Sequence, residues 1–98
     1  MLDSQIVQDE IRKVCSEIAE LLISKNKKYG NSALEPKRIF SSASPIEQIN
    51  VRIDDKLSRI ANQLSMARGD EDEDVEKDLI GYLVLKRVYL NLEEKINA

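Results

Sequence analysis

Apolar residues recur at steps of three and four along most of the chain, which is the spacing of one face of an α-helix and not of a strand. In the first such stretch they fall at Val7, Ile11, Val14, Ile18 and Leu22. We therefore predict a helix over residues 4–28. Gly30 is placed to take the left-handed conformation that ends it, and the lysines just before suit the negative end of its dipole.

The second stretch has a complete start signal. Ser44 is placed as the N-cap, Pro45 as the first helical residue and Glu47 as the third, which closes a capping box. The apolar positions that follow are Ile46, Ile49, Ile53, Leu57, Ile60 and Leu64. This pattern predicts a helix that ends before Gly69.

The third stretch is apolar around most of a helical circumference. We expect Asp70 to cap this helix, with the acidic residues after it near the positive end of the dipole. Its large side chains are Leu79, Ile80, Tyr82, Leu83, Val84, Leu85, Val88, Tyr89 and Leu90. Two other helices cover only part of such a surface, which predicts a homo-oligomer, most simply a symmetric dimer that completes a helical bundle. The alternative is a monomer in which the connection over residues 31–43 covers the remainder.

That connection is longer than most links between packed helices, and such segments are usually lids, binding loops or disordered. It contains Leu34, Ile39 and Phe40, which we expect to dock against the helices. The chain as a whole is predicted to be one all-α domain over residues 1–98, a three-helix bundle completed by dimerisation.

Composition and charge limit the binding partners and the cellular location that we expect for this protein. The net charge of −3 disfavours a polynucleotide partner. No signal peptide and no apolar run of membrane-spanning length occurs, so secretion and a membrane location are not expected. Cys15 is the only cysteine, which suits a reducing cytoplasm and a role as a small apolar helix residue.

The residue types that are missing exclude whole reaction classes. The sequence has no histidine, so it forms no Ser-His-Asp or Cys-His site and no His-ligated zinc site. Its three glycines are far apart and make no phosphate-binding glycine loop. A phosphate group would need lysine, arginine or a metal ion, and carboxylate ligands would favour Mg²⁺ or Mn²⁺.

Charged candidates occur on each predicted helix. Glu17 and Glu20 are three residues apart on the first helix and are candidate Mg²⁺ ligands. The alternative, which is the commoner one for a generic helix, is a solvated acidic face paired with Arg12, Lys13 or Lys25. The second helix carries a polar ladder of Arg52, Asp55, Lys56 and Arg59. Its cations suit phosphate oxygens, with an ordinary row of surface ion pairs as the alternative.

Asp74 and Asp78 are one turn apart at the start of the third apolar stretch. A carboxylate beside buried surface needs a partner, which is either a cation from the second helix or a metal ion. Tyr29, Phe40 and Tyr82 are candidates for stacking on a nucleobase, or for packing in the core.

Four segments occur in this order: KNKKYGNSAL at 25–34, RIF at 38–40, RIDDKLSRI at 52–60 and EDVEKDLIGYLVL at 73–85. Together they resemble the nucleotide-modification-associated domain 1 family of phages and bacteria, over roughly residues 20–90. The family's acidic residue before the tyrosine of KNxDYG is Lys28 here.

More distantly, the carboxylate-bearing helices are similar to MazG-type all-α nucleoside triphosphate pyrophosphohydrolases, which hold Mg²⁺ on an ExxE helix and a later ExxD helix. This resemblance places Glu17 and Glu20 in the first motif and Asp78 at the end of the second. Val75 occupies the position three before Asp78, so only Asp74 would replace the missing carboxylate.

The first functional hypothesis is a nucleotide-binding oligomer with a polar pocket between the three helices. In its enzymatic version Glu17, Glu20, Asp74 and Asp78 hold Mg²⁺, and Asp78 and Glu20 are the candidates for activating water. Phosphates and base would be bound by Lys25, Tyr29, Arg52, Asp55, Lys56, Arg59 and Tyr82. The alternatives are a phage protein that sequesters a nucleotide second messenger without hydrolysing it, and a helical protein–protein adaptor.

Overall fold

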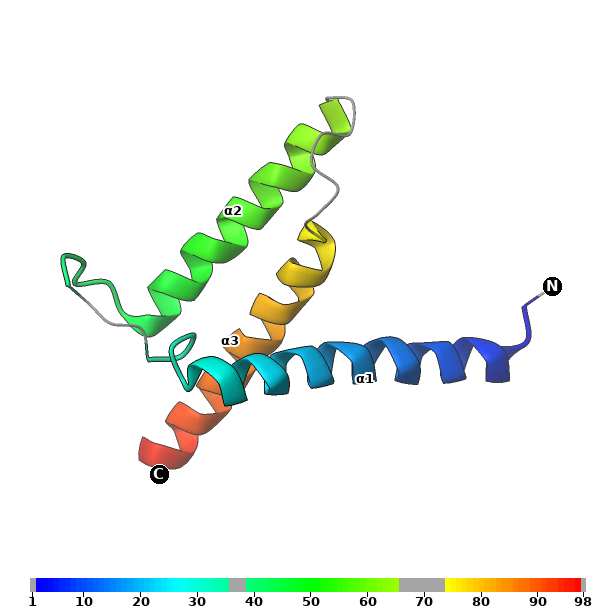
Figure 1. Cartoon of the computed structure of the whole chain (residues 1–98), viewed down its shortest axis with the longest axis horizontal. Helices are drawn as coiled ribbons and strands as arrows, with labels where there is room; N and C mark the ends of the chain where they lie inside the picture. The colour runs from blue at the N-terminus through cyan, green and yellow to red at the C-terminus, as the bar shows by residue number, and fades with distance from the viewer. Residues whose placement is uncertain (1, 36–38, 66–73, 98) are drawn as a thin grey trace. The chain divides into compact units, whose positions relative to one another are not determined.

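The computed structural model describes residues 2–35, 39–65 and 74–97, and in that part of the chain it has three helices and no strand. Figure 1 shows α1 (Ser4–Tyr29), α2 (Pro45–Ser65) and α3 (Val75–Asn97). The all-α class predicted from the sequence is confirmed. The chain divides into two compact units, one of residues Met1–Gly30 and one of residues Asn31–Ala98.

The first unit is α1 with its two caps. Asp3 precedes the helix in an extended conformation, and its side chain accepts a hydrogen bond of 2.8 Å from the Gln5 amide. At the other end the Gly30 amide donates to the Asn26 carbonyl at 2.7 Å. The predicted extent is confirmed to within one residue. Gly30 has a positive φ of 68°, but its ψ of −152° lies outside the left-handed helical region that we predicted.

α2 begins as its sequence predicts. The Glu47 amide donates to Oγ of Ser44 at 3.2 Å, and the Gln48 amide donates to the Ser44 carbonyl at 3.0 Å. The side chain of Gln48 also donates to the Ala43 carbonyl at 2.9 Å. Pro45 costs no hydrogen bond at the first helical position, because amides there have no partner within the helix.

α3 begins later than predicted. Asp74 is not helical, and its Oδ1 accepts a hydrogen bond of 2.9 Å from the Lys77 amide, so Asp74 and not Asp70 caps α3. A helix running on from Asp70 would have included Asp74, and the carboxylate of Asp74 instead satisfies an amide that the first turn leaves unpaired. The acidic residues 70–73 lie outside the described residues.

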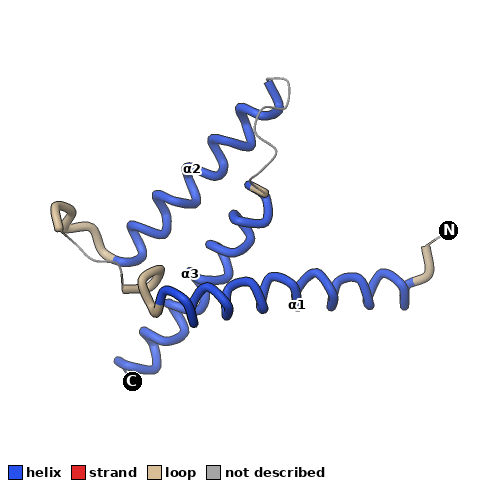
Figure 2. The backbone as a smooth tube through the Cα atoms, viewed as in Figure 1, coloured by secondary structure: helices blue, strands red, loops and turns tan. Residues whose placement is uncertain are grey.

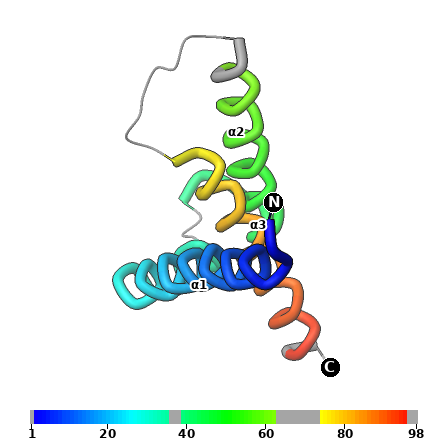
Figure 3. Tube along the Cα trace, turned by 90° about the vertical axis from the view of Figure 1, so that its right-hand side faces the viewer, coloured from blue at the N-terminus to red at the C-terminus, as the bar shows by residue number. Residues whose placement is uncertain are grey.

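α2 and α3 pack side by side as an antiparallel hairpin, which Figures 2 and 3 show from two directions. Ile49 from α2 and Val75 from α3 are buried. A hydrogen bond of 2.8 Å from Nζ of Lys86 to Oδ1 of Asn50 also joins the two helices. The α2 stripe is therefore buried at Ile49, whereas Leu57 of the same stripe is 51% exposed.

Several apolar side chains of α3 stay exposed, as the sequence predicted for a helix with so wide an apolar surface. They are Ile80, Leu83, Val84, Val88, Leu90 and Leu92. No helix among the described residues is long and apolar enough to cross a membrane.

The expectation that Ile39 and Phe40 dock is wrong. Their exposed fractions are 77% and 101%, whereas Leu34 is half-buried. The backbone after them is held by local polar contacts, including a bond of 3.0 Å from the Ala43 amide to Oγ of Ser41. These contacts lead the chain into the Ser44 cap without using either apolar side chain.

Candidate functional site

A salt bridge between α2 and α3 is the most enclosed charged feature of the described residues. Nζ of Lys56 lies 3.4 Å from Oδ2 of Asp78, and the exposed fractions of the two side chains are 9% and 27%. At 100° per residue, Lys56 lies at the border between the apolar stripe of α2 and its polar side. This position explains why its long side chain is covered while its charge meets a carboxylate.

Two arginines extend the polar edge on either side of Lys56. Arg52 is one turn before it and Arg59 is almost one turn after it, and both are exposed. Nε of Arg59 lies 3.2 Å from Oδ2 of Asp55, in a pair whose side chains are about half exposed. Arg52 forms no ion pair with any described residue. The Arg59–Asp55 pair is of the surface kind that the alternative interpretation expected. We call Arg52, Lys56 and Arg59 the cationic edge of α2.

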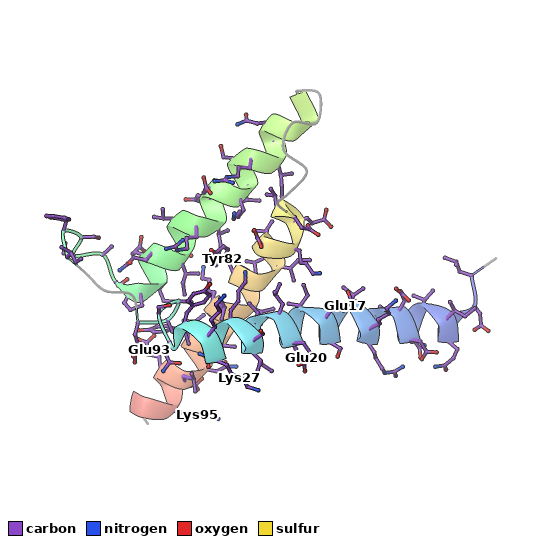
Figure 4. The ribbon with its side chains drawn as sticks, in the orientation of Figure 1. Glu17, Glu20, Lys27, Tyr82, Glu93 and Lys95 are labelled. Carbon is purple, nitrogen blue, oxygen red and sulfur yellow. The ribbon has the colours of Figure 1, made fainter. Side chains whose placement is uncertain are left out.

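On α3, Tyr82 follows Asp78 by one turn and is half-buried (Figure 4). Lys86 follows by a further turn and reaches Asn50 of α2. The steps of four residues put these three side chains along one side of α3. The sequence analysis did not select Lys86 or Asn50. The spacing of Lys86 from Asp78 and Tyr82 was the available signal.

Asp74 has a structural role. Its side chain accepts from the Lys77 amide and its carbonyl accepts from the Asp78 amide at 3.0 Å. It therefore lies before α3 as the capping residue, one turn from Asp78 along the chain.

The remaining candidates belong to the first unit and are described by themselves. Glu17, Glu20 and Lys25 project from α1 and are exposed; the two glutamates are labelled in Figure 4. Tyr29, at the end of α1, has an exposed fraction of 62%. Nζ of Lys28 lies 5.3 Å from the centre of its ring, which is the geometry of a cation–π contact.

Two described carboxylates of the second unit have identified partners, a lysine for Asp78 and a backbone amide for Asp74. No three potential metal ligands gather anywhere in the described segments. Asp78 already faces the Lys56 ammonium group and Asp74 holds an amide, so a metal ion would have to displace both interactions. Mg²⁺ also requires near-octahedral oxygen ligation, which one paired carboxylate does not supply.

Comparison with known proteins returned no match: no family model, no curated protein and no solved structure is similar to this chain.

Proposed function

We propose that this protein binds a nucleotide or a nucleotide-derived small molecule, with the phosphate groups held at the cationic edge of α2. The observation that carries the proposal is the arrangement of Arg52, Lys56 and Arg59 along one edge beside the α2–α3 contact. The resemblance of four ordered segments to a nucleotide-associated family supports the same conclusion.

The spacing of the cations suits a ligand with more than one negative group. Arg59 is seven positions after Arg52, which is a rise of about 10 Å along the helix. A guanidinium group donates two parallel hydrogen bonds to a phosphate, so each arginine would hold one anionic group in a defined orientation. Exposure leaves the Arg52 guanidinium accessible to such a ligand.

The pairing of Lys56 with Asp78 gives the edge a fixed centre. The Lys56 charge is largely offset by the Asp78 carboxylate 3.4 Å away, so this pair orders the edge but adds little net positive potential. A ligand phosphate would interact chiefly with the arginines on either side. Asp55 would orient Arg59, to which it is already joined.

Aromatic side chains offer a surface for the base. Tyr82 is half-buried on the side of α3 that carries Asp78, and Tyr29 is exposed at the end of α1. Stacking of a nucleobase on an aromatic ring is tolerant of base identity. We propose Tyr82 as the stacking residue for a ligand held at the cationic edge.

Binding without turnover is the better supported version. The Lys56 ammonium group lies 3.4 Å from the Asp78 carboxylate and would compete with a metal ion for it. Sequestration of a nucleotide second messenger needs only cationic and aromatic contacts. The second candidate is a MazG-like, Mg²⁺-dependent pyrophosphohydrolase that uses Glu17, Glu20, Asp74 and Asp78, and its support is the family resemblance.

Self-association belongs to this proposal as well. The exposed apolar side chains of α3, including Leu83 at 50%, need cover that the hairpin does not provide. We propose a homo-oligomer, and a helical adaptor for another protein is the competing interpretation.

The decisive experiment is mass spectrometry of small molecules retained by the purified protein, followed by titration with a panel of nucleoside triphosphates and cyclic dinucleotides. Tight binding with ligand recovered unchanged after incubation with Mg²⁺ would support sequestration. Release of pyrophosphate would support the hydrolase. Absence of binding by every member of the panel, with no retained molecule, would overturn the nucleotide proposal.

A further inference from the structure

We infer that Lys86 of α3 and Asn50 of α2 form a binding site for one oxyanion, a carboxylate or phosphate group of a ligand. A hydrogen bond of 2.8 Å from Nζ of Lys86 to Oδ1 of Asn50 holds the two side chains together. The inference rests on contacts within the second unit and does not depend on the proposed function.

This pair lies on the edge of the α2–α3 hairpin opposite the cationic edge. At 100° per residue, Asn50 is about 160° from Arg52 around α2. Each step of four residues along α3 adds a rotation of about 40°, so Lys86 is turned by about 80° from Asp78. The contact of Lys56 with Asp78 and the contact of Lys86 with Asn50 therefore reach different edges. An anion at Lys86 would bind separately from a phosphate at Arg52.

The two lysines that join the helices differ in their counter-charge. Lys56 faces a carboxylate, whereas Lys86 donates to a neutral amide oxygen and forms no ion pair with any described residue of the second unit. Glu47 and Asp54 lie on the same side of α2 as Asn50, and neither pairs with Lys86. Contact with α2 removes water from part of the Lys86 ammonium group without supplying a negative charge, and a bound anion would offset that cost.

The hydrogen bond leaves two neighbouring donor groups. An ammonium group has three N–H bonds, and an amide that accepts through its oxygen still has two N–H bonds on its nitrogen. Neither Nδ2 of Asn50 nor the remaining N–H groups of Lys86 have an acceptor among the described residues. Two adjacent donors, one of them charged, suit two oxygens of a carboxylate or phosphate group. A neutral ligand would leave the charge without a partner, so the ligand class is an oxyanion.

The first test supplies the missing charge from within the chain. Asn50→Asp has nearly the same shape and gives Lys86 a carboxylate, so it should close the site to an added anion. Inorganic phosphate or acetate should raise the urea midpoint of the wild type above its value in chloride at equal ionic strength, because the anion binds only the folded chain. Asn50→Asp and Lys86→Gln should both lose this increase.

Lys77→Gln is the matched control for the loss of charge. It removes a positive charge from another half-buried lysine of α3 and should keep the anion-specific increase. The general effect of each salt on stability is the same in both lysine variants and cancels in the comparison. Circular dichroism confirms that each variant keeps its helices.

The second test observes the site directly by nuclear magnetic resonance. The side-chain amide signal of Asn50, assigned by its loss in Asn50→Asp, should shift saturably on titration with inorganic phosphate or with acetate. The apparent dissociation constant should rise at least about tenfold in Lys86→Gln, through loss of one charged hydrogen bond, and stay within about twofold in Lys77→Gln. A response to acetate alone assigns a carboxylate ligand, and a response to phosphate alone assigns a phosphate ligand.

Absence of a saturable shift with both anions would overturn the inference, and the bond would then serve only to align the helices. Equal weakening in Lys86→Gln and Lys77→Gln would also overturn it, since the anion would be responding to net charge. An anion-dependent midpoint that persists undiminished in Asn50→Asp would place the binding elsewhere. Selective loss in Asn50→Asp and Lys86→Gln would establish the site.

Discussion

Nζ of Lys56 lies 3.4 Å from Oδ2 of Asp78 across the α2–α3 hairpin, and the lysine side chain is only 9% exposed. This contact joins residues that are 22 positions apart in the sequence. It fixes how far α2 is shifted along α3, and it places a polar pair at the edge of a core in which Ile49 and Val75 are buried. The proposed phosphate-binding edge is built around this pair.

Removing one partner of this pair should destabilise the hairpin. Lys56→Met leaves the Asp78 carboxylate partly buried without its cation, and we expect a loss of about 1–2 kcal/mol in the free energy of unfolding. Urea unfolding followed by circular dichroism measures the change. A double-mutant cycle with Asp78→Asn should show a favourable coupling. The exposed pair Asp55–Arg59 supplies the control, since Arg59→Ala should cost less than about 0.5 kcal/mol. Equal losses for Lys56→Met and Arg59→Ala would contradict a special role for the buried pair.

The Asp74 cap should contribute measurably to the free energy of unfolding. Asp74→Ala removes the acceptor for the Lys77 amide, and we expect a cost of about 1 kcal/mol. Glu76→Ala, in the first turn, loses only a dipole interaction and should cost a few tenths of a kcal/mol, roughly. Urea unfolding of both variants makes the comparison. If Asp74→Ala were neutral, another residue would have to cap the helix in solution.

Replacing Gly30 should destabilise the end of α1, and the cause should be its backbone conformation. A Cβ added there would meet nothing within 4 Å, so any cost comes from the φ of 68° and ψ of −152°. Gly30→Ala should cost about 1–3 kcal/mol locally and fray the last turn of α1. Hydrogen exchange of the residue-30 amide, which donates to Asn26, would accelerate. A D-alanine at position 30 adds the same methyl group and tolerates positive φ, so it should preserve protection. Loss of protection with both isomers would point to crowding by the methyl group.

Arg52 should matter for ligand affinity and not for the stability of the fold. Arg52→Gln removes an exposed guanidinium that makes no ion pair with any described residue. We expect about tenfold weaker binding of the nucleotide that the panel identifies, with unfolding unchanged within about 0.5 kcal/mol. Isothermal titration calorimetry measures the affinity. Arg87→Gln, an exposed arginine on α3, is the matched control and should bind normally. Equal weakening by both substitutions would indicate a general charge effect and not a site.

The starts of the helices were the most predictable part of the fold. Ser44, Pro45 and Glu47 form a local signal, and the structure follows it. At α3 the same logic selected the wrong aspartate. Asp70 and Asp74 are equally good caps by residue type, and the sequence alone does not tell which of them precedes the first residue that packs, here the buried Val75. Local rules therefore predicted that a cap exists but not its exact position.

The sequence predicted the charged residues of α2 and those of α3 separately, but not which of them meet. The sequence placed Lys56 in a polar ladder on the second helix and indicated that Asp78 needs a partner. Which residue of α2 lies level with Asp78 depends on the hairpin register, and the loop between the helices does not reveal that register. For the same reason the Asn50–Lys86 bond was missed. Ile39 and Phe40 were misjudged because apolar character alone does not provide a surface on which to pack.

Each helix begins at a polar side chain directly before it: Asp3, Ser44 and Asp74. Each helix start is therefore determined by a capping bond between residues two or three positions apart, and not by the length of the preceding connection. A substitution at one of these three caps should therefore alter the first turn of its own helix and leave the other two helix starts unchanged.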